Sequence, residues 1–489
     1  MKTKKGEFIM GNLDVLKKRF NPRRFYRDET TGTEIEVDGA FVRIDPSLES
    51  QRGKEVIEIP LEDLLQDPAV IRSARVSTGR DTKDINEKAG RLIEKLYSGH
   101  HETPFEGGVT LRLKVITPIC YAEPFFQLPL SHNERSLRYS AYNFETEHFF
   151  IPPVYRAKQW IVPVYEEGER ESQKLYQFFL SQGVSREQAR FALLFRFFTE
   201  FYWTVSLRHL LEILSWEPNV LTPAAFWSIR DNLIAQIIKD WTPWTADVVF
   251  EKPRLTPTNF GLSHSSEIIE AMLETLKKQA QKEDVVSIGS IWFLPVCGND
   301  EILKLGVLTN PNPRRGFGHA SMTFLLNIPI FVYRQWVRHR YGAWSALPTN
   351  FDEVVHHRDF YLPLSWRRQL GGAMDYNYEE VEPELSSKLR LMFFNFVEGC
   401  CRRYRRLRQF GVPPQDAALN LPYVFRVKRL WTANVESLMN FFSLRCDKQA
   451  QWEIRQFAHA IYPRFRKSFP WANEIFLRYL NFGKSSIFR

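Results

Sequence analysis

Hydrophobic and polar positions along the chain follow two different periods, and both periods occur in each half of the sequence. Short runs rich in β-branched residues, TLRLKVITPI at residues 110–119 and SMTFLLNIPIFVY at residues 321–333, end at or near a proline and predict strands. Longer stretches at residues 186–214 and 386–410 carry apolar residues at helical spacing, which predicts long helices. We therefore expect an α+β fold in which helices dominate.

One unit occurs twice along the chain. PICYAEPFFQLPL from Pro118 matches PIFVYRQWVRHR from Pro329, at an offset of 211 residues. Further on the offset becomes 228, where GVSREQAR from Gly183 matches GVPPQDAA from Gly411. Because the matches keep the same order in both halves, they indicate a tandem duplication rather than chance similarity. The step from 211 to 228 predicts extra residues in the second copy, within residues 367–391.

Composition divides the chain into four parts. Residues 1–53 match nothing in the second copy and are rich in charge and glycine, which predicts an N-terminal extension. The first repeat is expected at residues 54–276, and the polar stretch KKQAQKED at residues 277–284 is expected to be a solvated linker or the end of a helix. The second repeat then occupies residues 285–489.

Composition and charge narrow the class of protein. A hydrophobic content of 44% with 14% aromatic residues supplies large cores and excludes a disordered chain. The formal charge of +9 fits a pocket for anionic ligands at least as well as a nucleic-acid surface. Five cysteines without zinc spacing predict reduced thiols, no metal site and a cytoplasmic location. No run of eighteen apolar residues occurs, so we expect no membrane span.

Two polar segments stand out as candidates for chemistry. In the first copy, residues 131–139 read SHNERSLRY and offer hydroxyl, carboxylate and guanidinium groups suited to a small polar ligand. In the second copy, residues 334–340 read RQWVRHR and present cationic groups that suit a diphosphate. Taken alone, the first segment is also typical of a helix cap and the second of a solvated basic face.

Together the two segments resemble the signature RHRxxSxNExSxR of the flavin-dependent thymidylate synthases, in which a glutamine precedes the motif. Here the signature is divided between the copies. The second copy keeps RQWVRHR, but Ala346, Pro348 and Asn350 stand where the motif has Glu, Ser and Arg. The first copy keeps SHNERSLRYS but has FFQLPL in place of the basic triplet. The resemblance covers about 430 residues and implies two tandem copies of that family's fold, an antiparallel sheet with long helices.

The resemblance implies one composite nucleotide site. Arg445 is the implied catalytic residue, because its guanidinium would polarise the pyrimidine ring. The implied substrate-binding residues come from both copies: Gln335 and Arg338 from the second, and Glu134, Arg135, Ser136, Arg138 and Arg190 from the first. At the reciprocal site, Glu217 takes the place of Arg445 and Ala418 that of Arg190, so a nucleotide monophosphate should not bind there.

The resemblance also implies a set of flavin-binding residues and partners. The residues are Thr103, Glu106, Asn133, Glu134, Arg208, Arg338, His339, Arg340, Asn434 and Asn440. The implied activity is methylation of dUMP to dTMP, with FAD as cofactor and with methylenetetrahydrofolate and NADPH as co-substrates. Sites in this family combine residues of more than one subunit of a homotetramer, so we expect a homodimer that forms a pseudo-tetramer.

Two alternatives stay open at this point. One is a diverged flavin and folate enzyme that acts on another pyrimidine nucleotide or on RNA, for which the basic run at residues 402–408 leaves room. The other is a non-catalytic nucleotide-binding scaffold. Binding of a nucleic acid is less expected than binding of dUMP, and binding to a membrane is not expected.

Overall fold

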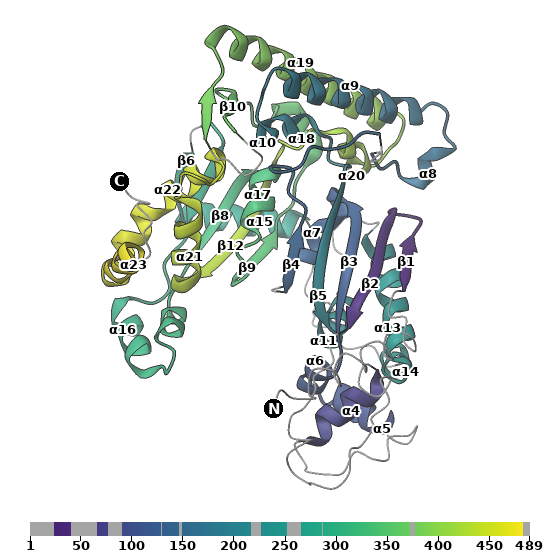
Figure 1. The fold of residues 1–489 in the computed structure, drawn as a ribbon, viewed down its shortest axis with the longest axis vertical. Helices are drawn as coiled ribbons and strands as arrows, with labels where there is room; N and C mark the ends of the chain where they lie inside the picture. Colours follow the sequence, from purple (N-terminus) through teal and green to yellow (C-terminus); the bar gives the residue numbers. More distant parts are fainter. Residues whose placement is uncertain are drawn as a thin grey trace, which may run out of the picture.

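The computed structural model describes most of the chain. The described residues are 24–40, 66–76, 90–128, 130–145, 149–216, 226–251, 266–285, 287–371 and 377–482. They form two five-stranded antiparallel sheets, one in each half of the chain, with helices around them (Figure 1). The prediction of an α+β fold in two copies is confirmed. Within the described ranges, no helix combines the length and apolar character that a bilayer crossing requires.

The two sheets have the same strand order. The first, in the order β1-β2-β3-β5-β4, consists of Phe25–Asp28, Thr33–Ala40, Thr110–Pro118, Phe198–Ser206 and Ser131–Glu134. The second, in the order β6-β7-β8-β12-β9, consists of Gln281–Val285, Gly289–Phe293, Ser321–Pro329, Arg426–Asn434 and Gly342–Ala346. The registers agree as well, because Leu113 pairs with Trp203 and Phe324 pairs with Trp431. These pairs reproduce both offsets, 211 and 228, that the sequence matches show.

The repeat boundaries differ from those expected. β1 and β2 lie within residues 1–53, yet they pair at the edge of the first sheet and correspond to β6 and β7 of the second. Residues 277–284, expected as a linker or the end of a helix, contain the end of helix α15 (Ser266–Gln279) and, in addition, most of β6. β6 is an edge strand and is exposed at four of its five positions. Because an exposed strand can be rich in polar residues, its sequence resembles that of a linker.

The expected long helix at residues 186–214 is wrong. This stretch contains the short helix α10 (Arg186–Ala189), a single 3₁₀ turn, the central strand β5 and helix α11 (Leu207–Leu214). Buried and half-buried residues alternate along β5, which is rich in aromatic residues and pairs with β3 and β4 on its two sides. Tertiary pairing therefore overrides the apolar pattern. The other expected helix is confirmed as α19 (Pro383–Gln409).

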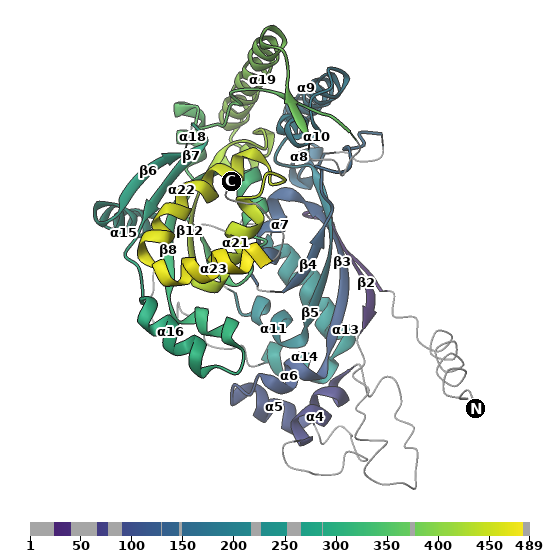
Figure 2. The same ribbon diagram turned by 60° about the vertical axis from the view of Figure 1, so that its left-hand side comes forward.

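The two repeats pack against each other around a local two-fold relation. The long helices α9 (Val162–Ser181) and α19 lie side by side at one end of the molecule (Figures 1 and 2). Below them, Phe195 N donates to Leu421 O at 2.9 Å, and Tyr423 N donates to Leu193 O at 2.8 Å. These two bonds exchange equivalent residues, 228 positions apart, as the two halves of a homodimer interface would.

Candidate functional site

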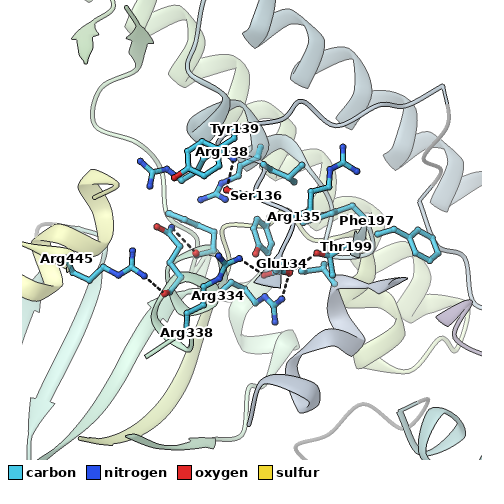
Figure 3. Close-up of a pocket in the computed structure, with 17 residues that line it drawn as sticks. Glu134, Arg135, Ser136, Arg138, Tyr139, Phe197, Thr199, Arg334, Arg338 and Arg445 are labelled. Carbon is cyan, nitrogen blue, oxygen red and sulfur yellow. Dashed lines mark hydrogen bonds and ion pairs between the residues drawn. The ribbon is translucent and has the colours of Figure 1, made fainter. Parts of the chain in front are cut away.

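A pocket lies between the repeats, and both contribute to its walls (Figure 3). One glutamate and six arginines line it: Glu134, Arg135, Arg138, Arg190, Arg334, Arg338 and Arg445. Gln335, Ser136, Tyr139, Tyr423 and several phenylalanines complete the wall. An excess of guanidinium groups in a partly enclosed space attracts anions, and phosphate most of all. All eight nucleotide-site residues inferred from the sequence line this one pocket.

Glu134 is the centre of the charge network in the pocket. It ends strand β4 and accepts hydrogen bonds from Arg334, from Arg338 Nη2 at 2.8 Å and from Thr199 Oγ1 at 2.7 Å. Burial alone would raise the pKa of Glu134, but Arg334 and Arg338 outweigh burial and lower it to about 2. Glu134 is therefore a carboxylate at neutral pH. It belongs to the first repeat and forms ion pairs with two arginines of the second repeat.

Arg334 was not assigned a role from the sequence, although it begins the RQWVRHR segment. It lies on helix α17 (Ile330–Trp336), its side chain is 5% exposed, and its guanidinium sits 4.1 Å from the ring centroid of Phe126. A buried arginine of this kind needs a carboxylate partner. In the sequence, the signal for this role was the place of Arg334 at the start of the motif, directly before Gln335.

Arg445 is the last residue of helix α21 (Val435–Arg445) and points into the pocket. Its Nε donates to His339 Nε2 at 2.9 Å and its Nη2 donates to the backbone oxygen of Gln335 at 3.0 Å. Burial, with the nearby charges of Arg338 and Arg138, lowers the pKa of Arg445 to about 10. It remains a cation at neutral pH. Burial holds the pKa of His339 well below its ordinary value, so a neutral imidazole accepts the bond.

Gln451 bonds to one pocket residue from each repeat, and the sequence analysis did not assign it a role. It precedes helix α22 (Trp452–Ser468) and is 1% exposed. Its side-chain oxygen accepts from Arg190 Nη2 at 2.6 Å and from Gln335 Nε2 at 2.9 Å. Among the described residues, Gln335 Oε1 and Gln451 Nε2 are buried polar atoms without a partner. Such atoms call for a ligand or a water molecule with both donor and acceptor groups.

The loop after β4 presents the remaining residues of the first repeat. Ser136 Oγ accepts from the backbone N of Arg138 at 3.3 Å, which shapes the loop. Arg138 Nε donates to Glu187 at 3.0 Å, and its Nη2 donates to the backbone oxygen of Gln449 at 3.1 Å. Arg135 turns back on its own loop and donates to the backbone oxygen of Ala141 at 3.1 Å. The loop therefore carries one arginine toward the second repeat and holds the other at the rim.

The residues expected to bind the flavin lie in two groups. His339, Arg340, Asn434 and Asn440 lie on or beside α21, where Asn434 caps the helix by accepting from Ser437 N at 2.8 Å. Arg340 Nη1 donates to Leu130 O at 2.6 Å, just before the strand that carries Asn133.

The second group lies at the far end of the first repeat. Thr103 and Glu106 lie on helix α6 (Thr103–Gly108), and Arg208 of α11 pairs with Glu106 at 3.5 Å and with Glu102 at 2.7 Å. The two groups lie far apart within the chain (Figures 1 and 2).

The reciprocal position on the second sheet carries a different set of residues. Glu134 pairs with Phe201 across β4 and β5, while Ala346 pairs with Arg429 across β9 and β12. Since Phe201 and Arg429 are 228 residues apart, the strand register agrees with the alignment of Glu134 with Ala346. Glu217, the residue at the position of Arg445, lies outside the described residues.

Most arginines of the basic run at residues 402–408 form ion pairs or hydrogen bonds with other residues of the protein. Arg403 is buried and pairs with Glu171, and Arg408 pairs with Asp352 at 3.2 Å. Arg405 donates to the backbone oxygen of Val355 at 3.4 Å. These bonds explain most of the run as a link between α19 and its neighbours.

Comparisons with known proteins find one matching family model and several similar proteins. The family model described as thymidylate synthase complementing protein matches residues 61–244 and 302–471, one segment in each repeat. A protein named flavin-dependent thymidylate synthase from Thermosipho melanesiensis is 36% identical over 163 residues, which is 33% of this chain and 70% of that protein. A protein of the same name from Thermus thermophilus is 34% identical over 205 residues, 38% of this chain and 73% of that protein.

A similar solved structure is the crystal structure of a UMP/dUMP methylase, PolB from Streptomyces cacaoi, bound with 5-Br dUMP. It is 23% identical, has a TM-score of 0.35, and the match covers 40% of this chain and 94% of the other.

Proposed function

Because this chain belongs to the thymidylate synthase complementing protein family, whose curated relatives are named flavin-dependent thymidylate synthases, we propose that it methylates dUMP to dTMP at one composite site. The observation that carries the proposal is the pocket between the repeats (Figure 3). Six arginines and Gln335 converge there from two repeats, although neither repeat holds the complete set. Such a pocket suits a ligand with one dianionic end and one polar ring.

The two sides of the pocket divide the work on the nucleotide. Arg138 and Arg190 of the first repeat, with the hydroxyl of Ser136, bind the phosphate. Gln335 offers a side-chain amide whose oxygen is buried without a partner, which suits the hydrogen-bonding edge of a uracil ring. Arg338, held by Glu134, adds a guanidinium from the second repeat to the site.

Arg445 stabilises the charge that develops on the pyrimidine ring. Methylation at C5 requires this carbon to act as a nucleophile, so the ring must first be polarised to carry negative charge, which passes into the carbon bond as it forms. A guanidinium that is already fixed in place stabilises this charge without reorganisation. The hydrogen bonds to neutral His339 and to the Gln335 backbone fix Arg445 and leave its full positive charge.

The group beside α21 fits an anionic flavin nucleotide. His339, Arg340 and Asn434 offer imidazole, guanidinium and amide groups, and His339 Nδ1 is buried without a partner. Beside Asn434, a Cβ added at Gly318 would meet only the amide nitrogen of Asn434, at 3.7 Å, so space is open there. FAD supplies hydride transfer when it is bound.

The second group of flavin residues supports a dimer in which each chain completes a flavin site of its partner. Thr103, Glu106 and Arg208 lie too far from α21 to share its flavin within one chain (Figure 2). We place them in the flavin site of a second copy, so that two chains form a pseudo-tetramer. Methylenetetrahydrofolate as carbon donor and NADPH as reductant complete the proposed reaction.

The full chain with FAD, dUMP, methylenetetrahydrofolate and NADPH tests the function. We expect dTMP formation, a flavin absorbance spectrum and one dUMP bound per chain by calorimetry. Two dUMP per chain would contradict the single composite site. Binding of dCMP or transfer RNA without binding of dUMP would establish the diverged enzyme instead. A colourless protein that cannot be reconstituted with FAD would establish the scaffold.

A further inference from the structure

The second repeat contains a hairpin that has no counterpart among the described residues of the first repeat. Helices α9 and α19 end at equivalent residues, Ser181 and Gln409, but they contain 20 and 27 residues, so α19 begins earlier. Before α19 the chain forms the antiparallel hairpin of β10 (Arg367–Gln369) and β11 (Tyr378–Glu380). The first repeat has only the four-residue helix α8 (Pro153–Arg156) in this place. The extra residues expected within residues 367–391 thus include an element of defined structure.

The hairpin is attached to the first repeat just before Arg190. Ser185 N donates to Arg367 O at 2.7 Å, and Arg367 N donates to Gln188 Oε1 at 2.6 Å. Gln188 Nε2 donates to Ser365 O at 3.0 Å. In Figure 1, β10 lies beside helix α10, which carries these residues. The insertion therefore packs across the repeat boundary, against the segment that leads into the nucleotide pocket.

One face of the hairpin, which carries Arg367 and Tyr378, packs against the first repeat. The register pairs Arg367 with Glu380 and Gln369 with Tyr378, so Arg367 and Tyr378 lie on the same face. Arg367 Nη2 lies 2.9 Å from Glu453 Oε1 and 3.6 Å from Glu187 Oε1. Tyr378, on the same face as Arg367, interacts electrostatically with Glu187 and Arg138, and burial raises the pKa of its hydroxyl. Tyr378 thus faces a residue of the nucleotide pocket and the carboxylate that holds it.

The four ionic groups form an alternating row, Arg138, Glu187, Arg367 and Glu453. Glu187 is 2% exposed and Glu453 is 0% exposed, so both carboxylates depend on these arginines. Glu187 is shared between two arginines, and it therefore orients Arg138 without cancelling its charge completely. A guanidinium that is oriented before the ligand arrives binds phosphate with a smaller entropic cost.

We propose that the β10–β11 hairpin is a positioning element for the phosphate end of the nucleotide site, in which the Tyr378 hydroxyl fixes the orientation of Arg138. The inference rests on the proposed function, because it takes the phosphate of a pyrimidine nucleotide as the group that Arg138 receives. Tyr378 is a positioning residue, since it acts through Arg138.

The Tyr378→Phe variant tests this role, because it removes one hydroxyl and keeps the ring. Tyr155→Phe is the matched control: Tyr155 lies on α8 of the first repeat and donates to Asp416 at 2.6 Å. Asp416 is the residue equivalent to Gln188, at the offset of 228, so the control removes a comparable bond on the reciprocal side. Binding of dUMP and of deoxyuridine, which has no phosphate, is measured for both variants, together with kcat, KM and Tm.

We expect Tyr378→Phe to raise the Kd and the KM for dUMP roughly three- to tenfold, as the loss of one hydrogen bond predicts. We expect kcat to change by less than about twofold and deoxyuridine binding to stay the same, since hydrogen-bond loss acts only on the phosphate end. Tyr155→Phe should leave all these values unchanged.

Two failures can be told apart. Wild-type protein that does not bind dUMP would overturn the proposed function and the positioning role with it. Wild-type binding of dUMP with an unchanged affinity in Tyr378→Phe would overturn the positioning role alone. An equal loss of dUMP and deoxyuridine binding, or a fall in kcat at constant KM, would also overturn it, because neither is an effect on the phosphate.

Discussion

The interface between the repeats contains two related sites, the nucleotide pocket and its reciprocal. Each site contains one ion pair that joins the two repeats. At the proposed nucleotide site, called the working site below, Arg334 of the second repeat pairs with Glu134 of the first. At the reciprocal site, Arg429 Nη2 lies 2.7 Å from Glu123 Oε2 and 4.4 Å from the ring centroid of Tyr333. Both sites thus secure the interface with a buried guanidinium that contacts an aromatic ring.

Only the acid of the reciprocal pair stands at the position of a charged residue of the other pair, because Arg429 is equivalent to Phe201 and Glu134 to Ala346. Glu123 stands 211 residues before Arg334, at the equivalent position, so the acid occupies the place of the base. The other cations of the working site have no equivalents, because Arg338, Arg138 and Arg190 correspond to Gln127, Asn350 and Ala418. The comparison teaches that the interface and the binding chemistry are separable. A duplicated chain can keep an ion pair at both sites and keep the ligand-binding cations at one.

The largest effect is expected at Arg445. Arg445→Ala should lower kcat for dTMP formation about 100- to 1000-fold, the usual loss when a fixed donor to developing charge is removed. The reciprocal site cannot compensate, since its residue at this position is Glu217. Steady-state assays of dTMP formation measure the loss, and calorimetry shows whether dUMP still binds.

Arg445→Lys is the control for charge at this position. Lysine keeps the positive charge but cannot reproduce the two fixed bonds to His339 and to the Gln335 backbone. We therefore expect an activity between those of the wild type and the alanine variant. Full activity in Arg445→Ala would mean that the pyrimidine ring is activated elsewhere, and the assignment of the working site would fail.

The second effect compares the two ion pairs directly. Glu134→Gln leaves Arg334, 5% exposed, without its carboxylate and should lower the free energy of unfolding by roughly 3 kcal/mol. Glu123→Gln should cost less, because Glu123 is 19% exposed and holds one arginine, whereas Glu134 is 6% exposed and holds two. Urea unfolding of both variants gives these values.

Only the first of these variants should change nucleotide binding. Glu134 also holds Arg338, so Glu134→Gln should weaken dUMP binding as well as stability. Glu123→Gln should bind dUMP as the wild type does. Equal losses of dUMP binding in both variants would show that the reciprocal site takes part in binding, and the division of labour between the sites would be refuted.

Short motifs at fixed offsets predicted the duplication, and the family resemblance predicted eight of the residues that line the pocket, although not Arg334. The sequence did not predict β5, whose apolar residues suggest a helix until β3 and β4 are placed on either side. It also missed Gln451 and Glu187, which act by joining other side chains. Roles of this kind depend on distances between segments such as Arg190 and Gln451, 261 residues apart, and no local pattern records them.

The smallest effect is a pH dependence that belongs to the working site. The pKa of Glu134 is about 2 in the folded protein, below its ordinary value of 4.5, because Arg334 and Arg338 outweigh the effect of burial. A depressed carboxyl pKa contributes stability that is fully present above the unfolded pKa, near 4.5, and is lost as the pH falls toward 2. Glu134→Gln has no such carboxyl and should not show this loss.

The stability difference between the wild type and Glu134→Gln should therefore shrink on acidification. It should stay constant from pH 7 to about pH 5 and fall by about 2 kcal/mol between pH 4.5 and pH 3, at roughly 1.4 kcal/mol per pH unit. His132 titrates in the same range, because burial and Arg338, Arg334 and Arg340 lower its pKa to about 4 while Glu134 raises it. Measuring both proteins with His132→Gln added removes this second titration from the difference. Urea unfolding at pH 7, 4.5 and 3 provides the measurement, and a difference that does not change with pH would show that the two arginines do not hold Glu134 in its ionised form.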